Sequence, residues 1–412
     1  MLDVKMIYWA PLLHMYQPAF QDVRVLRQID KECYKPLLKM FEEHDNVKIS
    51  LNINAVLLEM LHEFDLSDTI EILHNLVSRN KIQITGTAKF HPILPLIPQK
   101  EAKHQIALNE ELIRKEFKNW ERGGFFPPEM SISPQVAKYI REIGYKWVIM
   151  SGIACPTEWP YDQIYTSPNG LMLFFRDDIL SNKISFNDIT AKEFVESLKE
   201  LSNNGSDEKY VITAQDVETF GWHHKKYERT FLSKTFGLIN DQNDIKSVFI
   251  SELDKYIPIT EKRIIPKDSS WSTSSDDLNK GNPYPLWDDP DNYVHKLYWK
   301  IMRRLNKLIT LIENIDLKIG WDVERHYNTA RWFYDRGICS DTIWWANPEH
   351  GTWSPNLIYK GVELLMKSAL NAQLALVHAN QSDIGEDYLN SISFYHNLVL
   401  MELHSKTKEL KR

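Results

Sequence analysis

The sequence predicts an α/β protein in which parallel strands alternate with helices and close, or nearly close, into a barrel, followed by a mainly helical region. Seven short runs rich in Ile, Val, Phe or Tyr occur in the first half of the chain, and helical patterns separate them. Strands that alternate with helices in this way are typical of βαβ units and a parallel sheet. The 412 residues leave room for more than one domain, at roughly 100–200 residues each.

The candidate strands lie at 6–13, 47–53, 82–87, 123–127, 146–151, 171–175 and 210–214. The segment 102–120 illustrates the helices between them, because Ile106, Ile113 and Phe117 recur at helical spacing and fall mostly on one face. The count of seven strands favours a closed or nearly closed barrel.

The amino-acid composition of the sequence changes near Ile265. Residues 266–291 are rich in Ser, Asp, Pro and Gly, which is typical of a loop, and a connection of this length is often functional. Helix-like apolar spacing follows at 294–315, 327–338, 355–376 and 392–410. We therefore expect a catalytic barrel at 1–265, a loop-rich connection at 266–292 and a helical region at 293–412.

The composition is that of an ordinary globular protein, with 43% hydrophobic and 25% charged residues. The net charge is −7 and the basic residues are scattered, which argues against nucleic acid as the main partner. No segment reaches the ~18 apolar residues that span a bilayer, so we expect no membrane partner. The apolar run at 6–13 lacks a basic region before it and a cleavage site after it, which favours a strand over a signal peptide.

The three cysteines, Cys33, Cys155 and Cys339, are far apart, and no Cys-x-x-Cys spacing occurs. This pattern argues against a disulfide framework or a zinc–thiolate site and fits a reducing compartment. We expect a cytoplasmic protein, and the sequence carries no signal for its oligomeric state.

Polar side chains gather at the ends of the predicted strands, where barrel enzymes carry their catalytic residues. His14 and Gln17 follow the first strand, His91 follows the third and Arg176 follows the sixth. Acidic residues follow the fourth and seventh strands: Glu129, Asp216 and Glu218.

Glu129 comes directly after two prolines, whose fixed φ angles stiffen the backbone. Either Ser131 or Ser133 offers an N-cap for a helix at 134–143. The pattern therefore predicts a carboxylate held on a rigid strand-to-helix turn. The alternative is a carboxylate that only stabilises the helix N-terminus through the macrodipole.

Asp216 and Glu218 are two residues apart, so both point to the same side if the strand continues. Two neighbouring carboxylates repel, which raises the pKa of one of them, and a general acid needs a carboxyl group that stays protonated near neutral pH. The alternative is a pair of solvated loop acids. Two carboxylates on either side of a bond form the arrangement that cleaves glycosides.

The histidines at the strand ends and at 223–224 do not show His-x-x-x-His or His-Glu-x-x-His spacing. We therefore expect no metal, and hydrogen bonds from neutral histidines to sugar hydroxyls are the better functional interpretation. The sequence also lacks Gly-x-Gly-x-x-Gly, Gly-x-x-x-x-Gly-Lys-Ser/Thr and Gly-x-Ser-x-Gly. Neither nucleotide binding nor a serine hydrolase is supported, and we expect no cofactor.

Tryptophan is abundant, with 13 in the chain and eight of them between Trp271 and Trp353. An indole ring can stack on the C–H face of a sugar, but a tryptophan-rich core explains the number equally well. The candidate stacking residues are Trp222, Trp271, Trp287 and Trp345.

Taken in order along the chain, these motifs resemble those of glycoside hydrolase family 57. Residues 13–18 are similar to its first motif, although Tyr16 stands where the family often has a second histidine, and residues 85–95 are similar to its second. The third and fourth motifs match 124–129 and 214–221, and the fifth, least strict motif matches 330–346. Residues 175–181 also resemble a strand-end pattern of the family.

The resemblance implies a (β/α)7 barrel, a helical C-terminal region that walls the active-site cleft, and a retaining double displacement on an α-glucan or related α-glycoside. It implies that Glu129 is the nucleophile and Asp216 the general acid/base. His14, Gln17, His91 and Arg176 are then expected to bind sugar hydroxyls, with Glu218 beside them.

The exact activity stays open at this level, because α-amylase, 4-α-glucanotransferase and branching enzyme are all compatible with the motifs. A non-catalytic glucan-binding protein is a rival interpretation, although both acids are present. A metal-dependent polysaccharide deacetylase is a second rival, but it needs an Asp together with a His-x-x-x-His pair, which the sequence lacks.

Overall fold

The computed structural model describes residues 5–203, 208–314 and 320–411. The chain divides into two compact units. Unit 1 comprises Met1–Lys89 and Leu94–Ser275, and unit 2 comprises Phe90–Ile93 and Asp276–Arg412. The division falls inside the long loop-rich stretch, and it assigns the short segment around His91 to unit 2.

Two sheets form the centre of unit 1. The first has the order β3-β2-β1-β8, with all pairs parallel and the short β9 against the start of β1. The second has the order β10-β6-β7-β5-β4. The strands are β1 (Ile7–Met15), β2 (Ile49–Ile53), β3 (Ile82–Ile84), β4 (Gly124–Phe125), β5 (Trp147–Ser151), β6 (Ile164–Thr166), β7 (Met172–Arg176), β8 (Lys209–Asp216), β9 (Ile245–Ser247) and β10 (Ile259–Arg263).

The two sheets meet at two places. A parallel bridge joins Gly86 to Phe125 beyond the ends of β3 and β4, and the N–H of Asp177, just past β7, donates to the carbonyl of Ile212 in β8 at 2.8 Å. Each of the seven predicted strands has its counterpart in β1, β2, β3, β4, β5, β7 and β8. The fold is thus the predicted (β/α)7 arrangement followed by a mainly helical region.

One feature of the second sheet was not predicted. β6 pairs antiparallel with β7 and parallel with β10, which extends the second sheet beyond the barrel strands. β1 is buried at all nine positions, as expected for a strand with both faces covered, and it reads as a continuous apolar run.

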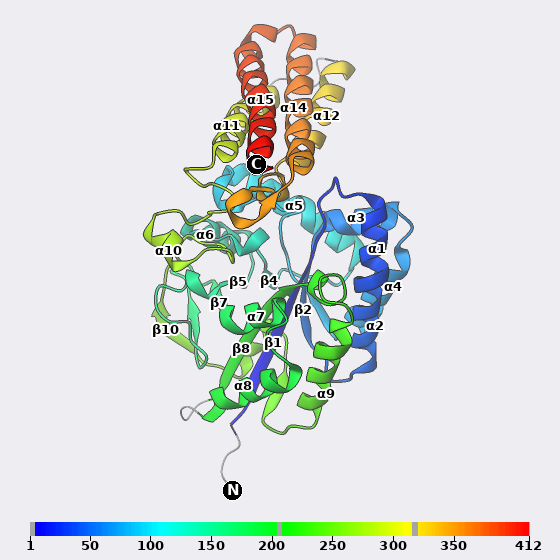
Figure 1. Cartoon of the computed structure of the whole chain (residues 1–412), viewed down its shortest axis with the longest axis vertical. Helices are drawn as coiled ribbons and strands as arrows, with labels where there is room; N and C mark the ends of the chain where they lie inside the picture. The colour runs from blue at the N-terminus through cyan, green and yellow to red at the C-terminus, as the bar shows by residue number, and fades with distance from the viewer. Residues whose placement is uncertain (1–4, 204–207, 315–319, 412) are drawn as a thin grey trace. The chain divides into compact units, whose positions relative to one another are not determined.

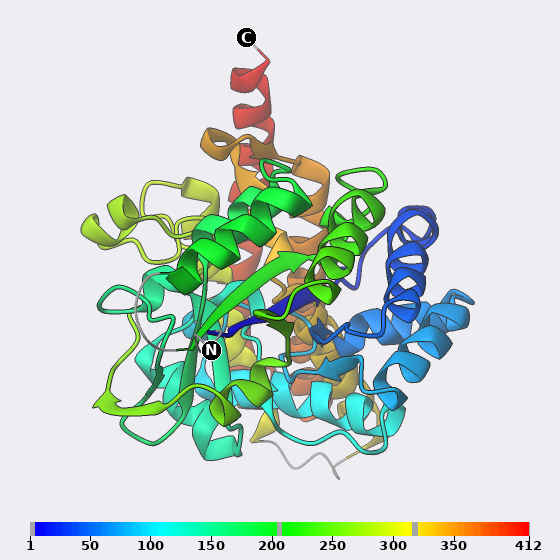
Figure 2. The same ribbon diagram turned by 90° about the horizontal axis from the view of Figure 1, so that it is seen from below.

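Helices surround the strands of unit 1 (Figures 1 and 2), with β1 and β8 lying side by side between them. The helices of this unit are α1 (Val23–Ile29), α2 (Lys35–Glu43), α3 (Ala55–Glu63), α4 (Ser67–Ser78), α5 (Gln99–Glu116), α6 (Pro134–Ile143), α7 (Asp178–Ser185), α8 (Ala191–Asn203) and α9 (Lys234–Asn240). A π-helical turn at Asp30–Tyr34 joins α1 to α2.

Unit 2 is a helical bundle in which α12 packs on α14, and α15 packs on both α11 and α14 (Figure 1). Its elements are α11 (Tyr293–Glu313), α12 (Trp321–Gly337), α13 (Asp341–Trp344), α14 (Pro355–His378), α15 (Ser382–Leu410) and the hairpin β11 (Ala346–Asn347) and β12 (Thr352–Trp353), and α10 (Ser275–Asn279) begins at the boundary. The four predicted helices are present, and Ile315 at the end of the first lies outside the described residues. None of the helices in the described ranges is both long enough and apolar enough to cross a membrane.

Candidate functional site

Glu129 stands in a strained turn directly after β4. Its φ and ψ are 58° and 19°, and the φ of the next residue, Met130, is 49°. The left-handed region is uncommon for residues other than glycine, and such strain, which costs on the order of 1–3 kcal/mol per residue, clusters at active sites. Of the two predicted caps, Ser133 is the N-cap of α6, whereas the Ser131 hydroxyl donates to the Pro128 carbonyl at 2.6 Å.

Trp271 anchors the loop that follows the barrel onto this turn. Its indole Nε1–H donates to Glu129 Oε2 at 2.9 Å, and its backbone N–H donates to the Glu129 carbonyl at 3.1 Å. The side chain is half-buried. The two hydrogen bonds fix both the backbone and the orientation of the Glu129 carboxylate.

His14 lies at the end of β1, directly opposite Asp216 of β8 in the strand register. Its Nδ1 is 2.6 Å from Asn52 Oδ1, and the Asn52 amide N–H donates to a threonine hydroxyl. The Asn52 oxygen is therefore the acceptor, and His14 carries its proton on Nδ1. Burial lowers the pKa of His14 to about 4, so the ring is neutral at pH 7.

The ring of His14 links the two acidic turns. It stacks on Phe126 with centroids 4.7 Å apart, and it meets Trp271 edge-on at 5.8 Å. The indole that holds Glu129 thus contacts the residue that is paired with Asp216. The fold brings the ends of β1, β4 and β8 to one place, as the parallel arrangement predicts.

Arg176 is a buried cation at the end of β7. It donates from Nε to the Ala214 carbonyl at 3.0 Å and from Nη1 to Asp178 Oδ1 at 3.0 Å, and its guanidinium carbon lies 5.9 Å from the Trp271 ring centroid. Burial lowers the pKa of Arg176, and the charges of Asp178 and Asp216 oppose that shift. A positive charge is therefore held beside Asp216.

Asp216 and Glu218 would share a strand face only if the strand continued past Asp216, and it does not. The strand ends at Asp216, and a single 3₁₀ turn at Val217–Thr219 follows. This turn directs Glu218 into the protein, where only 7% of it is exposed. The carboxylate pair is thus made by a turn and not by a shared strand face.

Glu218 is held by two donors from elements distant in sequence. Tyr34 donates its hydroxyl to Glu218 Oε1 at 2.5 Å, and Gln17 donates from Nε2 to the same oxygen at 2.7 Å. The amide oxygen of Gln17 accepts from Gln21 at 2.7 Å. Burial, with a smaller contribution from the charge on Asp216, raises the pKa of Glu218 to about 7.

Tyr34 belongs to this site but was not among the residues predicted from the sequence. It ends the π-helical turn at Asp30–Tyr34 and is fully buried. From the sequence, Tyr34 cannot be distinguished from an ordinary buried position of a helix, because a π-helical turn has no sequence signature. Gln17, predicted to bind sugar, uses both of its amide atoms within unit 1.

The candidate stacking tryptophans fall into different environments. Trp222 is half-buried beneath Lys225, whose Nζ lies 5.1 Å from its centroid, and Trp345 of unit 2 is half-buried against Trp344. Trp287 has no exposed surface, so the prediction that it stacks on sugar is wrong. Its ring is a core element of unit 2, next to Trp299, whose Nε1–H donates to the Trp287 carbonyl at 2.8 Å.

His91 belongs to unit 2 and also has a left-handed backbone, with a φ of 56°. Its Nδ1 lies 2.9 Å from the hydroxyl of Ser340, and its carbonyl accepts from the Ser340 N–H at 3.0 Å.

Seven of the predicted residues come together around the strand ends of unit 1: His14, Gln17, Glu129, Arg176, Asp216, Glu218 and Trp271.

A family model, glycosyl hydrolase family 57, matches residues 8–266, which is more than half of the chain. The chain belongs to glycosyl hydrolase family 57. The matched range covers the barrel strands from the second residue of β1 onward, and it contains all of the seven residues gathered at the strand ends except Trp271, which lies beyond its end.

Curated relatives agree with this assignment. An alpha-amylase of Pyrococcus horikoshii is 29% identical over 261 residues, which are 60% of this chain and 40% of that protein. A 4-alpha-glucanotransferase of Thermococcus litoralis is 26% identical over 261 residues, again 60% of this chain and 38% of that protein. The chain spans about two fifths of the length of the curated relatives that it matches.

Solved structures of the family have the same fold. A branching enzyme of Pyrococcus horikoshii gives a TM-score of 0.73 at 15% identity, over 95% of this chain and 94% of that one. The 4-alpha-glucanotransferase of Thermococcus litoralis gives 0.68 at 20% identity, over 88% of this chain and 60% of that one. These neighbours establish the barrel with its helical region.

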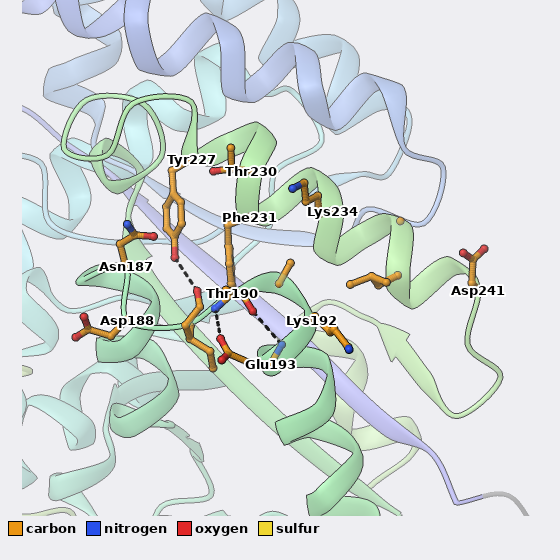
Figure 3. A pocket seen from close by; sticks show the side chains of 14 residues that line it. Asn187, Asp188, Thr190, Lys192, Glu193, Tyr227, Thr230, Phe231, Lys234 and Asp241 are labelled. Atoms are coloured by element: carbon orange, nitrogen blue, oxygen red, sulfur yellow. Dashed lines mark hydrogen bonds between the residues drawn. The ribbon is translucent and has the colours of Figure 1, made fainter.

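Two cavities of unit 1 lie away from these residues. Figure 3 shows one of about 790 Å³ beside the start of α8, where Tyr227 and Phe231 line it and the Thr190 N–H donates to Glu193 at 2.8 Å. The second, of about 850 Å³, is lined by Ile82 and Trp147, which are the first residues of β3 and β5. It therefore opens at the amino ends of the strands, opposite to Glu129 and Asp216.

Within residues 5–203, 208–314 and 320–411, no group of three or more His, Cys, Asp or Glu side chains is arranged to hold a metal ion.

Proposed function

We propose that the chain acts on α-1,4-glucans with retention of configuration, using Glu129 as the nucleophile and Asp216 as the general acid/base. One observation carries the assignment. The indole of Trp271 donates to Glu129 and its ring contacts His14, the strand partner of Asp216. Two carboxylates at facing strand ends are the minimum machinery of a retaining glycosidase.

In the first step Glu129 attacks the anomeric carbon and the glycosidic C–O bond breaks. Asp216 gives its proton to the departing oxygen, and a glycosyl-enzyme ester forms. In the second step Asp216 takes the proton from water or from a sugar hydroxyl, whose oxygen attacks the anomeric carbon and releases Glu129. The first half-reaction starts with Glu129 ionised and Asp216 protonated, and the second starts with Glu129 as the glycosyl ester and Asp216 ionised.

The surrounding groups suit these roles. The Trp271 N–H stabilises the carboxylate form of Glu129, since a donor to an ionised acceptor makes a strong hydrogen bond. His14 is neutral and fixed by Asn52, and we assign it to the binding of sugar hydroxyls, to which it adds no charge. The Arg176 guanidinium donates hydrogen bonds to Ala214, Asp178 and Asn182. We therefore assign Arg176 to the electrostatics of the site more than to direct sugar binding.

The proposed substrate class is supported by the relatives, which are named alpha-amylase and 4-alpha-glucanotransferase. The cytoplasm is the proposed location, and the three cysteines, which are free and buried, support a reducing compartment.

The test is an incubation of the purified protein with maltoheptaose, with products resolved by chain length, beside Glu129→Gln. Shorter chains alone indicate a hydrolase, and additional longer chains indicate a transferase. Glu129→Gln should lower the rate by at least about a thousandfold while glucan affinity is retained. An unchanged rate would exclude Glu129 as the nucleophile, and glucan binding without turnover in the unaltered protein would favour a non-catalytic glucan-binding protein.

A further inference from the structure

The turn that carries Asp216 and Glu218 is built onto the π-helical turn Asp30–Tyr34. The Cys33 thiol donates to the Val217 carbonyl at 3.1 Å, one residue before the carboxyl group that Tyr34 holds. Gly221 approaches the same turn so closely that an added Cβ would lie 2.4 Å from the Glu32 carbonyl oxygen. Glu32 and Lys225 form an ion pair on the outer side. The position of Tyr34 relative to Glu218 is therefore fixed by the backbone of both turns.

The two carboxyl groups of this turn compete for protons. The charge on Asp216 raises the pKa of Glu218, and by the same repulsion an ionised Glu218 favours a protonated neighbour, whereas a neutral Glu218 does not. Burial favours the protonated form of Glu218, whereas the hydrogen bonds from Tyr34 and Gln17 favour its ionised form. Tyr34 itself stays a donor, because burial and the Glu218 charge raise its pKa well above the usual value.

We propose that Tyr34 is a positioning residue for catalysis, whose hydrogen bond favours the ionised form of Glu218 against burial and so favours the proton of the pair on Asp216. This rests on the proposed role of Asp216 as the general acid. In the described part of the chain, the titratable or charged groups that face the pair include Cys33 from the π-helical turn, Arg176 from β7 and His14 from β1, which lies opposite Asp216. Burial lowers the pKa of His14 to about 4, so His14 is neutral near pH 7. Burial raises the pKa of the Cys33 thiol, so it remains neutral, and Arg176 stays charged, so neither exchanges protons with the pair near neutral pH.

The proposal is tested by the pH profile of kcat/KM on maltoheptaose. In Tyr34→Phe, Glu218 loses a donor and takes up the proton more readily, so Asp216 is deprotonated at lower pH. The alkaline limb should move to lower pH by about one unit. Glu218→Gln, which removes the competing charge altogether, should move the limb in the same direction. In the Glu218→Gln background, Tyr34→Phe should cause no further shift.

Tyr145→Phe is the matched control. Tyr145 is also a buried phenol that donates to a buried carboxylate, Glu110, at 2.9 Å, but it precedes β5 at the amino end of the strand. Its removal should leave the pH profile unchanged. The proposal is overturned if Tyr34→Phe leaves the alkaline limb in place, or if it shifts the limb equally with and without Glu218.

A second readout does not need activity, and it separates this proposal from the proposed function. Infrared difference spectra follow the protonated-carboxyl band that Glu218→Gln abolishes. Tyr34→Phe should raise the pH at which this band titrates. An unchanged titration in a folded variant overturns the proposal whether or not the protein turns over glucan, and inactivity of the unaltered protein with a shifted band would refute the proposed function alone.

Discussion

The indole N–H of Trp271 donates to Glu129 Oε2 at 2.9 Å, so a residue of the loop after the barrel orients the proposed nucleophile. Trp271→Phe keeps the aromatic contact with His14 but removes the donor. Because a hydrogen bond to a charged group is worth about 1.5–3 kcal/mol, kcat/KM on maltoheptaose should fall by roughly 10- to 100-fold, with little change in thermal stability. Steady-state kinetics and a melting curve check this, and an unchanged kcat/KM would mean that the hydrogen bond has no role in the reaction.

Asp216→Asn should separate the two half-reactions. A substrate whose leaving group needs no proton, such as a glycosyl fluoride, should still form the glycosyl-enzyme through Glu129. Hydrolysis of that ester should be slow, because Asn cannot take the proton from water, so the intermediate should accumulate. Intact-protein mass spectrometry of the quenched reaction measures it. If no adduct accumulates while maltoheptaose is still cleaved at the normal rate, Asp216 is not the acid/base.

Gly221→Ala should strongly destabilise unit 1. The φ of Gly221 is 131°, and the added Cβ would meet the Glu32 carbonyl oxygen at 2.4 Å. Strain of this kind costs on the order of 1–3 kcal/mol, and the backbone contact adds to it. Gly237→Ala in α9 is the control, since nothing lies within 4 Å of its added Cβ and alanine favours a helix by about 1 kcal/mol. Chemical denaturation should show a loss for the first variant and a small gain for the second.

The stability of the protein should fall as the pH drops from about 6.5 to about 4. Burial lowers the pKa of both His14 and His295 to about 4. Above pH 6.5 each is neutral in the folded and unfolded states. Below it the unfolded chain binds a proton that the folded protein does not, so each histidine removes up to roughly 3 kcal/mol by pH 4.

His295→Gln tests this dependence in unit 2. Glutamine retains an acceptor for the Asp289 N–H and a donor for the Ile343 carbonyl, which the two ring nitrogens now contact, but it does not titrate. The free energy of unfolding should therefore depend less steeply on pH between 4 and 6.5 than in the unaltered protein. The exposed His350→Gln is the control. Equal slopes for all three proteins would contradict the assignment.

Trp287→Ala should act on stability alone. The side chain has no exposed surface, and replacing a buried Trp by Ala costs about 3–5 kcal/mol. Binding of maltoheptaose to the folded fraction should be unchanged, which isothermal titration calorimetry measures. A selective loss of glucan affinity in a stable variant would restore Trp287 as a sugar-binding residue.

Much of the barrel could be predicted from the sequence because each strand is an apolar run bounded by turn residues. β1 is predictable since it is buried at every position, and α6 begins and ends where its Pro134 and Gly144 indicate. Glu129 and Asp216 could be placed at strand ends for the same reason. β6 could not be predicted, because three residues that pair with a neighbouring strand carry too little local pattern.

The sequence by itself determined the order of the seven barrel strands and the helices between them, and the strand ends at which the acids stand, since both follow from local hydrophobic periodicity. The tertiary structure decided which groups meet. It placed Trp271 on Glu129, Tyr34 on Glu218 and Trp287 in a core, through contacts between residues 142 and 184 positions apart in the first two cases. Such contacts depend on the packing of whole elements, which no local pattern encodes.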